Sequence, residues 1–178
     1  GNPYMGVGRN MAYRRSRFLE AKGFNNILHV TGGDDDLFVN QHARKGNTAV
    51  CIGAGSLTYS IPETTWQNFF RQKVRHLSVG YRYRLSHRVL LGLFTISWLL
   101  TWYGGVLLLF LSHHHSVIIA GVLGLRLVFV ATTIQFISKK LGEEFERWII
   151  PFLDIIYAFY YLVIGLRTLV TKKVRWKN

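Results

Sequence analysis

No charged residue occurs between Val89 and Leu111, and this run restricts the possible folds more than any other feature of the chain. A helix of that length crosses a hydrocarbon core roughly 30 Å thick. Two further apolar runs follow, at 117–137 and 148–170. The sequence therefore predicts a membrane region of about three helices over 89–178. The alternative for each run is a buried helix of a globular protein.

Arg126 and Asp154 are charged residues inside the second and third runs. Because a charge within a membrane is costly unless it faces protein or water, we expect the two side chains to pair inside a helix bundle. The basic segment Arg71–Arg88 flanks the first run and predicts that this side is cytoplasmic. If the third run also spans, the basic tail Lys172–Asn178 lies outside, against the same rule. A span is preferred for that run, and a re-entrant hairpin and an interfacial helix stay open.

The formal net charge of the chain is +13, and a dense basic segment lies directly before the first apolar run. Residues 66–88 place basic and aromatic side chains such as Trp66 and Phe69 at helical spacing, with Thr64 or Thr65 as the N-cap. This pattern is typical of an amphipathic helix at a membrane surface. Nucleic-acid binding is the competing explanation of the charge, but its position beside an expected span favours the membrane.

Residues 1–65 form the part of the chain that is expected to carry any chemistry. A helix is predicted over about Arg14–Lys22. The stretch Asn47–Glu63 predicts one or two short strands with a glycine-containing turn. The single cysteine, Cys51, excludes an internal disulfide.

Three consecutive aspartates, Asp34–Asp36, stand together in this basic chain. Their charges repel one another unless a cation, an arginine or a charged ligand offsets them. A carboxylate held near other carboxylates can act as a general base, because its pKa is raised. The alternative is an Asx-rich turn that caps a helix beginning at Leu37.

Two other patterns are found in some ligand sites, but in this sequence they do not predict one. The spacing Gly6-x-Gly8 indicates a phosphate loop only after a strand and with a third glycine, and neither is visible in the sequence. The run His113–His115 lies between the first two apolar runs. Three consecutive histidines cannot all point at one ion from a helix or a strand, so we predict a polar turn at the membrane surface and assign no metal ligands.

The motifs "GVGRNMAYRRSRF", "GGDDDLF" and "QKVRH", in this order, resemble the second half of a processive-type family 2 glycosyltransferase. The likeness is greatest to the membrane-bound family 2 enzymes of Bacteroidetes-type bacteria, and it covers almost the whole chain. It implies the α/β C-terminal part of a GT-A glycosyltransferase domain, partial over 1–65, followed by an α-helical transmembrane bundle. It also implies a multi-pass protein of the bacterial inner membrane with a cytoplasmic catalytic region.

The resemblance assigns the aspartates to catalysis. It implies that Asp35 deprotonates the acceptor hydroxyl, and Asp34 is the runner-up because the register against the family motif can slip by one. Asp36, with its neighbours, would set the pKa of the base and orient the loop.

The resemblance also implies residues that bind substrate. Gln72 and Arg75 match the Q-x-x-R-W pattern that holds the acceptor and the donor diphosphate in the family. His76 stands where tryptophan is usual, which puts acceptor stacking and long-polymer synthesis in doubt. Asn10 and Arg14 lie in the segment that lines the acceptor and donor cleft.

The implied reaction moves a sugar, with inversion, from a nucleotide-sugar donor to a lipid or glycan hydroxyl for cell-surface polysaccharide or glycolipid synthesis. The family binds its nucleotide and a Mg or Mn ion with an earlier D-x-D half that this sequence lacks. The chain is therefore expected to be a C-terminal fragment that is inactive by itself. The alternative is a non-catalytic membrane anchor or assembly subunit with a degenerate transferase half, and no nucleic-acid partner is expected.

Overall fold

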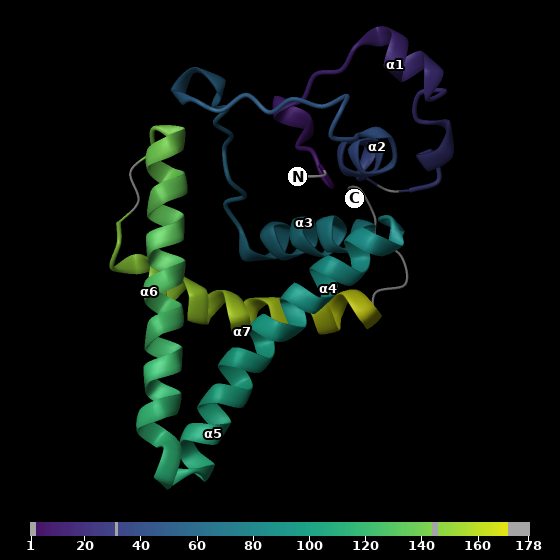
Figure 1. Cartoon of the computed structure of the whole chain (residues 1–178). Coiled ribbons are helices and arrows are strands. Elements are labelled where there is room, and N and C mark those ends of the chain that lie inside the picture. The colour runs from purple at the N-terminus through teal and green to yellow at the C-terminus, as the bar shows by residue number, and fades with distance from the viewer. Residues whose placement is uncertain (1–2, 31, 144–145, 171–178) are drawn as a thin grey trace. The chain divides into compact units, whose positions relative to one another are not determined.

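The computed structural model describes residues 3–30, 32–143 and 146–170, which form helices joined by irregular segments (Figure 1). The α-helices are α1 Arg15–Glu20, α2 Asp34–His42, α3 Trp66–Val79, α4 Leu85–Leu99, α5 Gly105–Leu111, α6 Ser116–Leu141 and α7 Ile149–Val170. The described residues contain no β-strand. The prediction of an α/β GT-A domain is therefore wrong.

The segment Asn47–Glu63 shows why the strand prediction fails. It has strand-forming composition, but its only regular element is a 3₁₀ turn at Ala54–Ser56. The side chains of Val50 and Ile61 are 78% and 92% exposed. A strand must pair its backbone N–H and C=O groups with another strand, and no described segment offers such a partner.

The chain divides into two compact units. Unit 1 consists of Gly1–Cys51, Leu57–Leu90 and Ile164–Asn178, and unit 2 of Ile52–Ser56 and Leu91–Val163. The predicted basic tail Lys172–Asn178 lies outside the described residues.

Helix α2 provides much of the apolar core of unit 1. Leu37 is fully buried and Phe38 nearly so. The Phe38 ring packs against the rings of Tyr13 and Phe18, with centroids 5.0 and 5.7 Å away, and Phe24 completes the cluster. These contacts fix α1 and the following turn on one face of α2.

Helix α3 begins where its sequence predicts. The Thr65 hydroxyl accepts a hydrogen bond from the Asn68 N–H at 3.3 Å, which satisfies one free amide of the first turn. Trp66, Phe69 and Phe70 contact one another along one side, and the Lys73 ammonium lies 5.2 Å from the Phe69 ring. This aromatic side with its lysine has the composition of a membrane-surface helix.

Gly33 allows α2 and α3 to approach closely. Its φ of +80° lies in the left-handed region, and a Cβ built there would come within 2.5 Å of Val79 Cγ1. Val79 itself is only 2% exposed, so it has little room to move. The glycine is therefore required by both its backbone conformation and its contact with α3.

We predict that Gly33→Ala lowers the free energy of unfolding by about 1–3 kcal/mol, because it adds both overpacking and backbone strain. Thermal or denaturant unfolding in detergent measures the change. Gly46→Ala is the matched control, since a Cβ there meets nothing within 4 Å. Equal effects of the two variants would contradict the close approach.

Three helical stretches are long and apolar enough to cross a membrane: Leu85–Leu111, His113–Leu141 and Ile149–Thr168. Within their most apolar windows only 6%, 6% and 17% of residues are buried. Helices of a globular core would be buried on most sides, so these apolar surfaces instead suit lipid. The chain is therefore a membrane protein.

The residues His113–His115 form the short 3₁₀ turn between α5 and α6.

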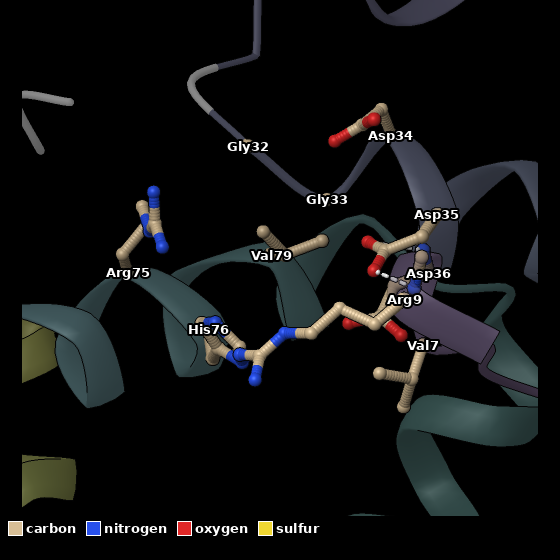
Figure 2. A pocket seen from close by; sticks show the side chains of 11 residues that line it. Val7, Arg9, Gly32, Gly33, Asp34, Asp35, Asp36, Arg75, His76 and Val79 are labelled. Atoms are coloured by element: carbon tan, nitrogen blue, oxygen red, sulfur yellow. Dashed lines mark hydrogen bonds between the residues drawn. The ribbon is translucent and has the colours of Figure 1, made fainter. Parts of the chain in front are cut away.

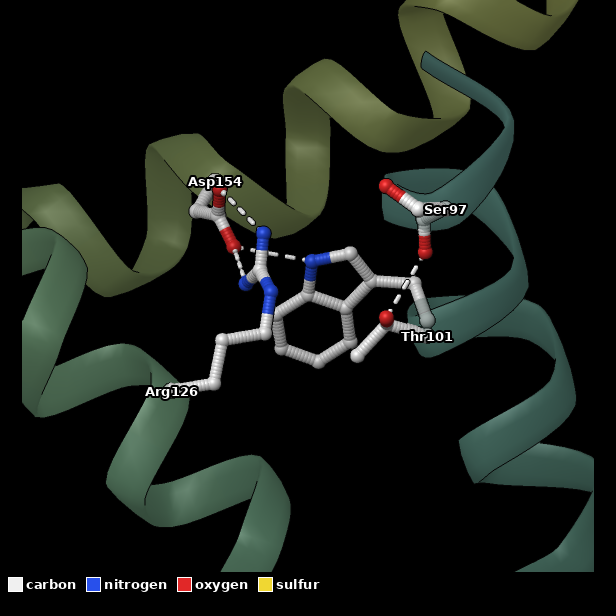
Figure 3. Close-up of polar contacts among 5 residues, drawn as sticks. Ser97, Thr101, Arg126 and Asp154 are labelled. Carbon is white, nitrogen blue, oxygen red and sulfur yellow. Dashed lines mark hydrogen bonds and ion pairs between the residues drawn. The ribbon is translucent and has the colours of Figure 1, made fainter. Parts of the chain in front are cut away.

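Arg126 and Asp154 pair within unit 2, as expected (Figure 3). Both guanidinium Nη atoms donate to the Asp154 carboxylate. The Trp102 indole N–H donates to the same carboxylate at 2.8 Å, and the guanidinium lies 5.2 Å from the Trp102 ring. Trp102 belongs to a π-helical turn, Leu100–Gly104, that connects α4 to α5. Three apolar helical stretches therefore meet at one partly buried carboxylate.

Helix α7 runs in the opposite sense to the first apolar stretch where the two meet. Asp154 contacts Trp102, whereas Tyr161, further along α7, packs on Trp98, which is earlier in α4. Moving forward along α7 therefore means moving backward along α4.

Removing one partner of the ion pair should leave a charge without compensation in apolar surroundings. We predict that Arg126→Leu or Asp154→Leu alone lowers the free energy of unfolding by about 3–5 kcal/mol. The double variant should lose less than the sum, because no unpaired charge remains. Unfolding in detergent measures the cycle, with Arg147→Leu, an exposed arginine, as the control. Additive losses would rule out the coupling.

Candidate functional site

A pocket of 220 Å³ in unit 1 brings together residues from three segments that are distant in the sequence (Figure 2). One wall is the start of α2 with its aspartates, and another is the end of α3. The third comes from a short 3₁₀ turn near the N-terminus, Gly8–Asn10. The lining residues are Val7, Gly8, Arg9, Gly32, Gly33, Asp34, Asp35, Asp36, Arg75, His76 and Val79.

The three aspartates form the first turn of α2, which begins at Asp34 and not at Leu37. The N-terminus of a helix carries a partial positive charge and free N–H groups, so acidic side chains are favoured there. The cap residue Gly33 has no side chain that could bond to these amides. This location offsets part of the repulsion between the carboxylates.

Asp35 connects two walls of the pocket. Its Oδ2 accepts the Gly8 N–H at 2.7 Å, and its Oδ1 accepts the Asp36 N–H at 2.9 Å. A Cβ at Gly8 would lie only 3.1 Å from Asp35 Oδ2, so the N-terminal turn sits close against this carboxylate. Both oxygens of Asp35 are therefore engaged in holding backbone.

Asp36 is 8% exposed and faces the interior. The Tyr83 phenol and the Gly6 N–H favour its charged form, and its Oδ1 has no hydrogen-bond partner among the described residues. Burial, with a contribution from the neighbouring Asp35 charge, raises the pKa of Asp36 above its ordinary value. Burial and the same carboxylate also raise the pKa of Tyr83, so the phenol stays a donor at neutral pH.

Asp34 differs from its two neighbours. Its side chain is exposed at the pocket and makes no hydrogen bond with the described residues. Figure 2 shows its carboxylate on the wall of the pocket that faces Arg75. Asp34 is therefore the carboxylate most available to an incoming ligand.

Positive charge on the pocket comes from arginine and not from histidine. Partial burial, then the nearby Arg75 and Lys73 charges, lower the pKa of His76, so its imidazole is neutral at neutral pH. Arg75 lines the wall opposite the aspartates, and the Arg9 side chain extends towards His76 (Figure 2). A carboxylate wall thus faces a guanidinium wall across a small space.

The structure gathers some of the predicted site residues and not others. Asp34, Asp35, Asp36, Arg75 and His76 all line the pocket. Gln72, Asn10 and Arg14 do not line it. Gln72 is half-buried on α3, Asn10 ends the N-terminal 3₁₀ turn, and Arg14 is the exposed residue before α1.

Sequence reasoning did not select Tyr83 or Asn40. Asn40 lies one helical turn after Asp36, so a polar i, i+4 pair within "DDDLFVN" was the available signal. No local pattern identifies Tyr83 as the partner of Asp36, because the two are far apart in the sequence.

The described residues contain no group of three or more His, Cys, Asp or Glu side chains placed to hold a metal ion. The aspartates are spread between an exposed, a backbone-bonded and a buried position, which does not resemble a cation site. The pocket residues therefore do not fit the Mg or Mn ion that the resemblance implies.

No family model, curated protein or solved structure matches the chain. The family resemblance stays a prediction that rests on the three motifs.

The raised pKa of Asp36 predicts how stability depends on pH. The folded state binds the Asp36 proton more tightly than the unfolded state, so ionisation lowers stability as pH rises from the ordinary value of 3.8 through the raised value. Asp36→Asn keeps an acceptor for Tyr83 without the charge. We therefore predict a higher unfolding temperature at pH 7 and little change below pH ~3.8. An Asp36→Asn gain that is largest in acid would contradict the burial argument.

Proposed function

We propose that this chain provides the acceptor side of a membrane-bound inverting glycosyltransferase. The enzyme would transfer a sugar from a nucleotide-sugar to a lipid or glycan hydroxyl, at the cytoplasmic face of a bacterial inner membrane. The observation that carries the proposal is the meeting of the "GVGRN", "GGDDDLF" and "QKVRH" segments at one pocket. These are the segments on which the family resemblance rests. The described residues nevertheless form helices and not the α/β fold of that family.

The chemistry of the two walls suits the transfer. The acceptor oxygen attacks the anomeric carbon while the bond from that carbon to the diphosphate oxygen breaks. The acceptor proton goes to a carboxylate on the α2 wall, and the nucleotide diphosphate leaves with the electron pair. Arg75 would stabilise the negative charge that develops on the diphosphate. Attack from the face opposite the leaving group inverts the anomeric centre.

The size of the pocket agrees with a partial site. Pockets that enclose a drug-sized ligand are typically about 300–1,000 Å³, and this one is 220 Å³. It suits the reacting end of an acceptor better than a whole nucleotide-sugar. The family resemblance places the donor nucleotide and its metal ion mainly on another half of the transferase domain, and no step here depends on them.

We assign the base to Asp34. Asp35 already accepts two backbone N–H groups, and Asp36 is buried against Tyr83, whereas Asp34 is exposed and makes no hydrogen bond with the described residues. A general base must reach the proton that it abstracts. The roles of Asp35 and Asp36 would be to hold the N-terminal turn and the end of α3 around it.

The test uses membranes from cells that express the whole gene encoding this chain, with radiolabelled nucleotide-sugars and lipid acceptors. We predict that Asp34→Asn lowers kcat by roughly 10²–10⁴-fold, as expected for loss of a general base. Asp35→Asn should lower kcat less, because the oxygen of the asparagine amide can still accept one of the two backbone N–H groups that Asp35 binds. Glu20→Gln, an exposed carboxylate on α1, is the control.

The outcomes separate the alternatives. A larger loss for Asp35→Asn than for Asp34→Asn would move the base to Asp35. If both variants keep kcat within about tenfold of wild type, the cluster is not the base. If the wild type transfers no sugar from any nucleotide-sugar, the proposed function fails and a non-catalytic membrane anchor or assembly subunit takes its place.

A further inference from the structure

We propose that Asn40 is a positioning residue that fixes the α2 wall of the pocket to the beginning of the first membrane helix. The consequence for kcat rests on the proposed sugar transfer. The geometric consequence, that α2 and the first turn of α4 move as one body, does not depend on that transfer. Asn40 lies outside the pocket, so it would act through the aspartates and not on the substrate.

Asn40 is fully buried, and its side-chain amide makes three hydrogen bonds, which use both of its N–H donors. Its Nδ2 donates to the Tyr4 carbonyl at 2.7 Å and to His87 Nδ1 at 2.9 Å. Its Oδ1 accepts the Arg84 N–H at 2.8 Å. Because a backbone N–H can only donate, the Arg84 bond fixes the orientation of the amide and makes His87 Nδ1 an acceptor.

These bonds lead to two other parts of unit 1, the N-terminal segment and the start of α4. Tyr4 belongs to the N-terminal segment that continues into the Val7–Arg9 wall of the pocket. Arg84 directly precedes α4, and His87 lies in its first turn. The Arg84 guanidinium also donates to the Gln41 carbonyl of α2. One side chain thus joins the helix that carries the aspartates to a second pocket wall and to the apolar stretch Leu85–Leu111.

Asp36 repeats this connection one turn earlier on α2. Gly6 of the N-terminal segment and Tyr83 of the α3–α4 connection are the groups that favour its charged form. Asp36 and Asn40, at i and i+4, therefore form two steps along one face of α2. A shift of α2 against the first turn of α4 would break the hydrogen bonds of the Asn40 amide and leave this buried group unpaired.

A buried polar network of this kind defines geometry more than it adds stability. The apolar cluster around Phe38 holds the other face of α2, but apolar contacts alone allow small shifts. A displacement of about 1 Å at a reacting group can lower a rate roughly 10²-fold. Asn40 would prevent such a shift of Asp34 and Asp35 relative to Arg75.

The experiment measures geometry and catalysis in the same protein. Spin labels at Arg44→Cys, just after α2, and Ser86→Cys, in α4, report the distance between the two elements. The exposed native cysteine is removed by Cys51→Ser. Asn40→Leu is compared with Gln41→Leu, which also replaces an amide side chain by leucine, on a half-buried neighbour whose side chain has no hydrogen bond with the described residues.

We expect Asn40→Leu to broaden the distance distribution and to lower kcat roughly 10²-fold, with KM for donor and acceptor within about threefold of wild type. Gln41→Leu should change neither. An unchanged distribution in Asn40→Leu would overturn the inference. A broadened distribution with an unchanged kcat would overturn the positioning role.

Two further variants keep the test decisive if Asn40→Leu does not fold. Asn40→Asp keeps the acceptor for Arg84 but loses both donors, and His87→Phe removes only the acceptor in α4. Both should broaden the distribution to a smaller extent, and no broadening in either would overturn the inference. If the wild type transfers no sugar, the proposed function fails, and the label distances alone decide whether Asn40 holds α2 to α4.

Discussion

The buried polar face of α2 is the contact on which unit 1 depends. Phe38 on the opposite face gathers the rings of Tyr13, Phe18 and Phe24, and this side holds α1 by apolar contact alone. The side of Asp36 and Asn40 holds the N-terminal segment and the start of α4 by directed hydrogen bonds. Apolar burial brings the segments together, whereas the hydrogen bonds specify their register. The pocket lies where the two kinds of contact end, at the first turn of α2.

The same helix start explains an acidic cluster in a chain of formal net charge +13. The helix dipole and the amides of Gly6 and Gly8 favour carboxylates at this position. The environment then separates the three residues by function. Asp36 is buried, Asp35 is bonded to backbone N–H groups, and Asp34 is exposed. Of three identical residues, Asp34 is therefore the candidate base, and Asp35 and Asp36 have structural roles.

Local patterns predicted some of the helices, but not the absence of strands, the end of α3 at Val79 or the assembly of the elements. Spacing and capping residues predicted α1 and the Thr65 cap of α3, and apolar length predicted the membrane region. The ion pair between Arg126 and Asp154 followed from the cost of burying either charge alone. The sheet prediction failed because strand propensity within Asn47–Glu63 says nothing about whether a partner strand exists. The bonds from Asn40 to Arg84 and His87 cross more than forty residues, and no periodicity reveals such contacts.

In the membrane part, as in unit 1, directed polar bonds and not apolar contacts alone specify how the helices pair. This pairing bears on the direction in which α7 runs. Lipid removes most of the hydrophobic drive between helices, so the carboxylate of Asp154, bonded by Arg126 and Trp102, determines which faces meet. An alternating bundle of three spans would run its third helix parallel to its first. Helix α7 instead runs against α4 between Asp154 and Tyr161. Of the arrangements that the sequence left open for this run, the interfacial one accommodates that sense, whereas the unbroken helix α7 leaves no turn for a re-entrant hairpin. An interfacial helix also removes the conflict that a third span creates with the distribution of lysine and arginine.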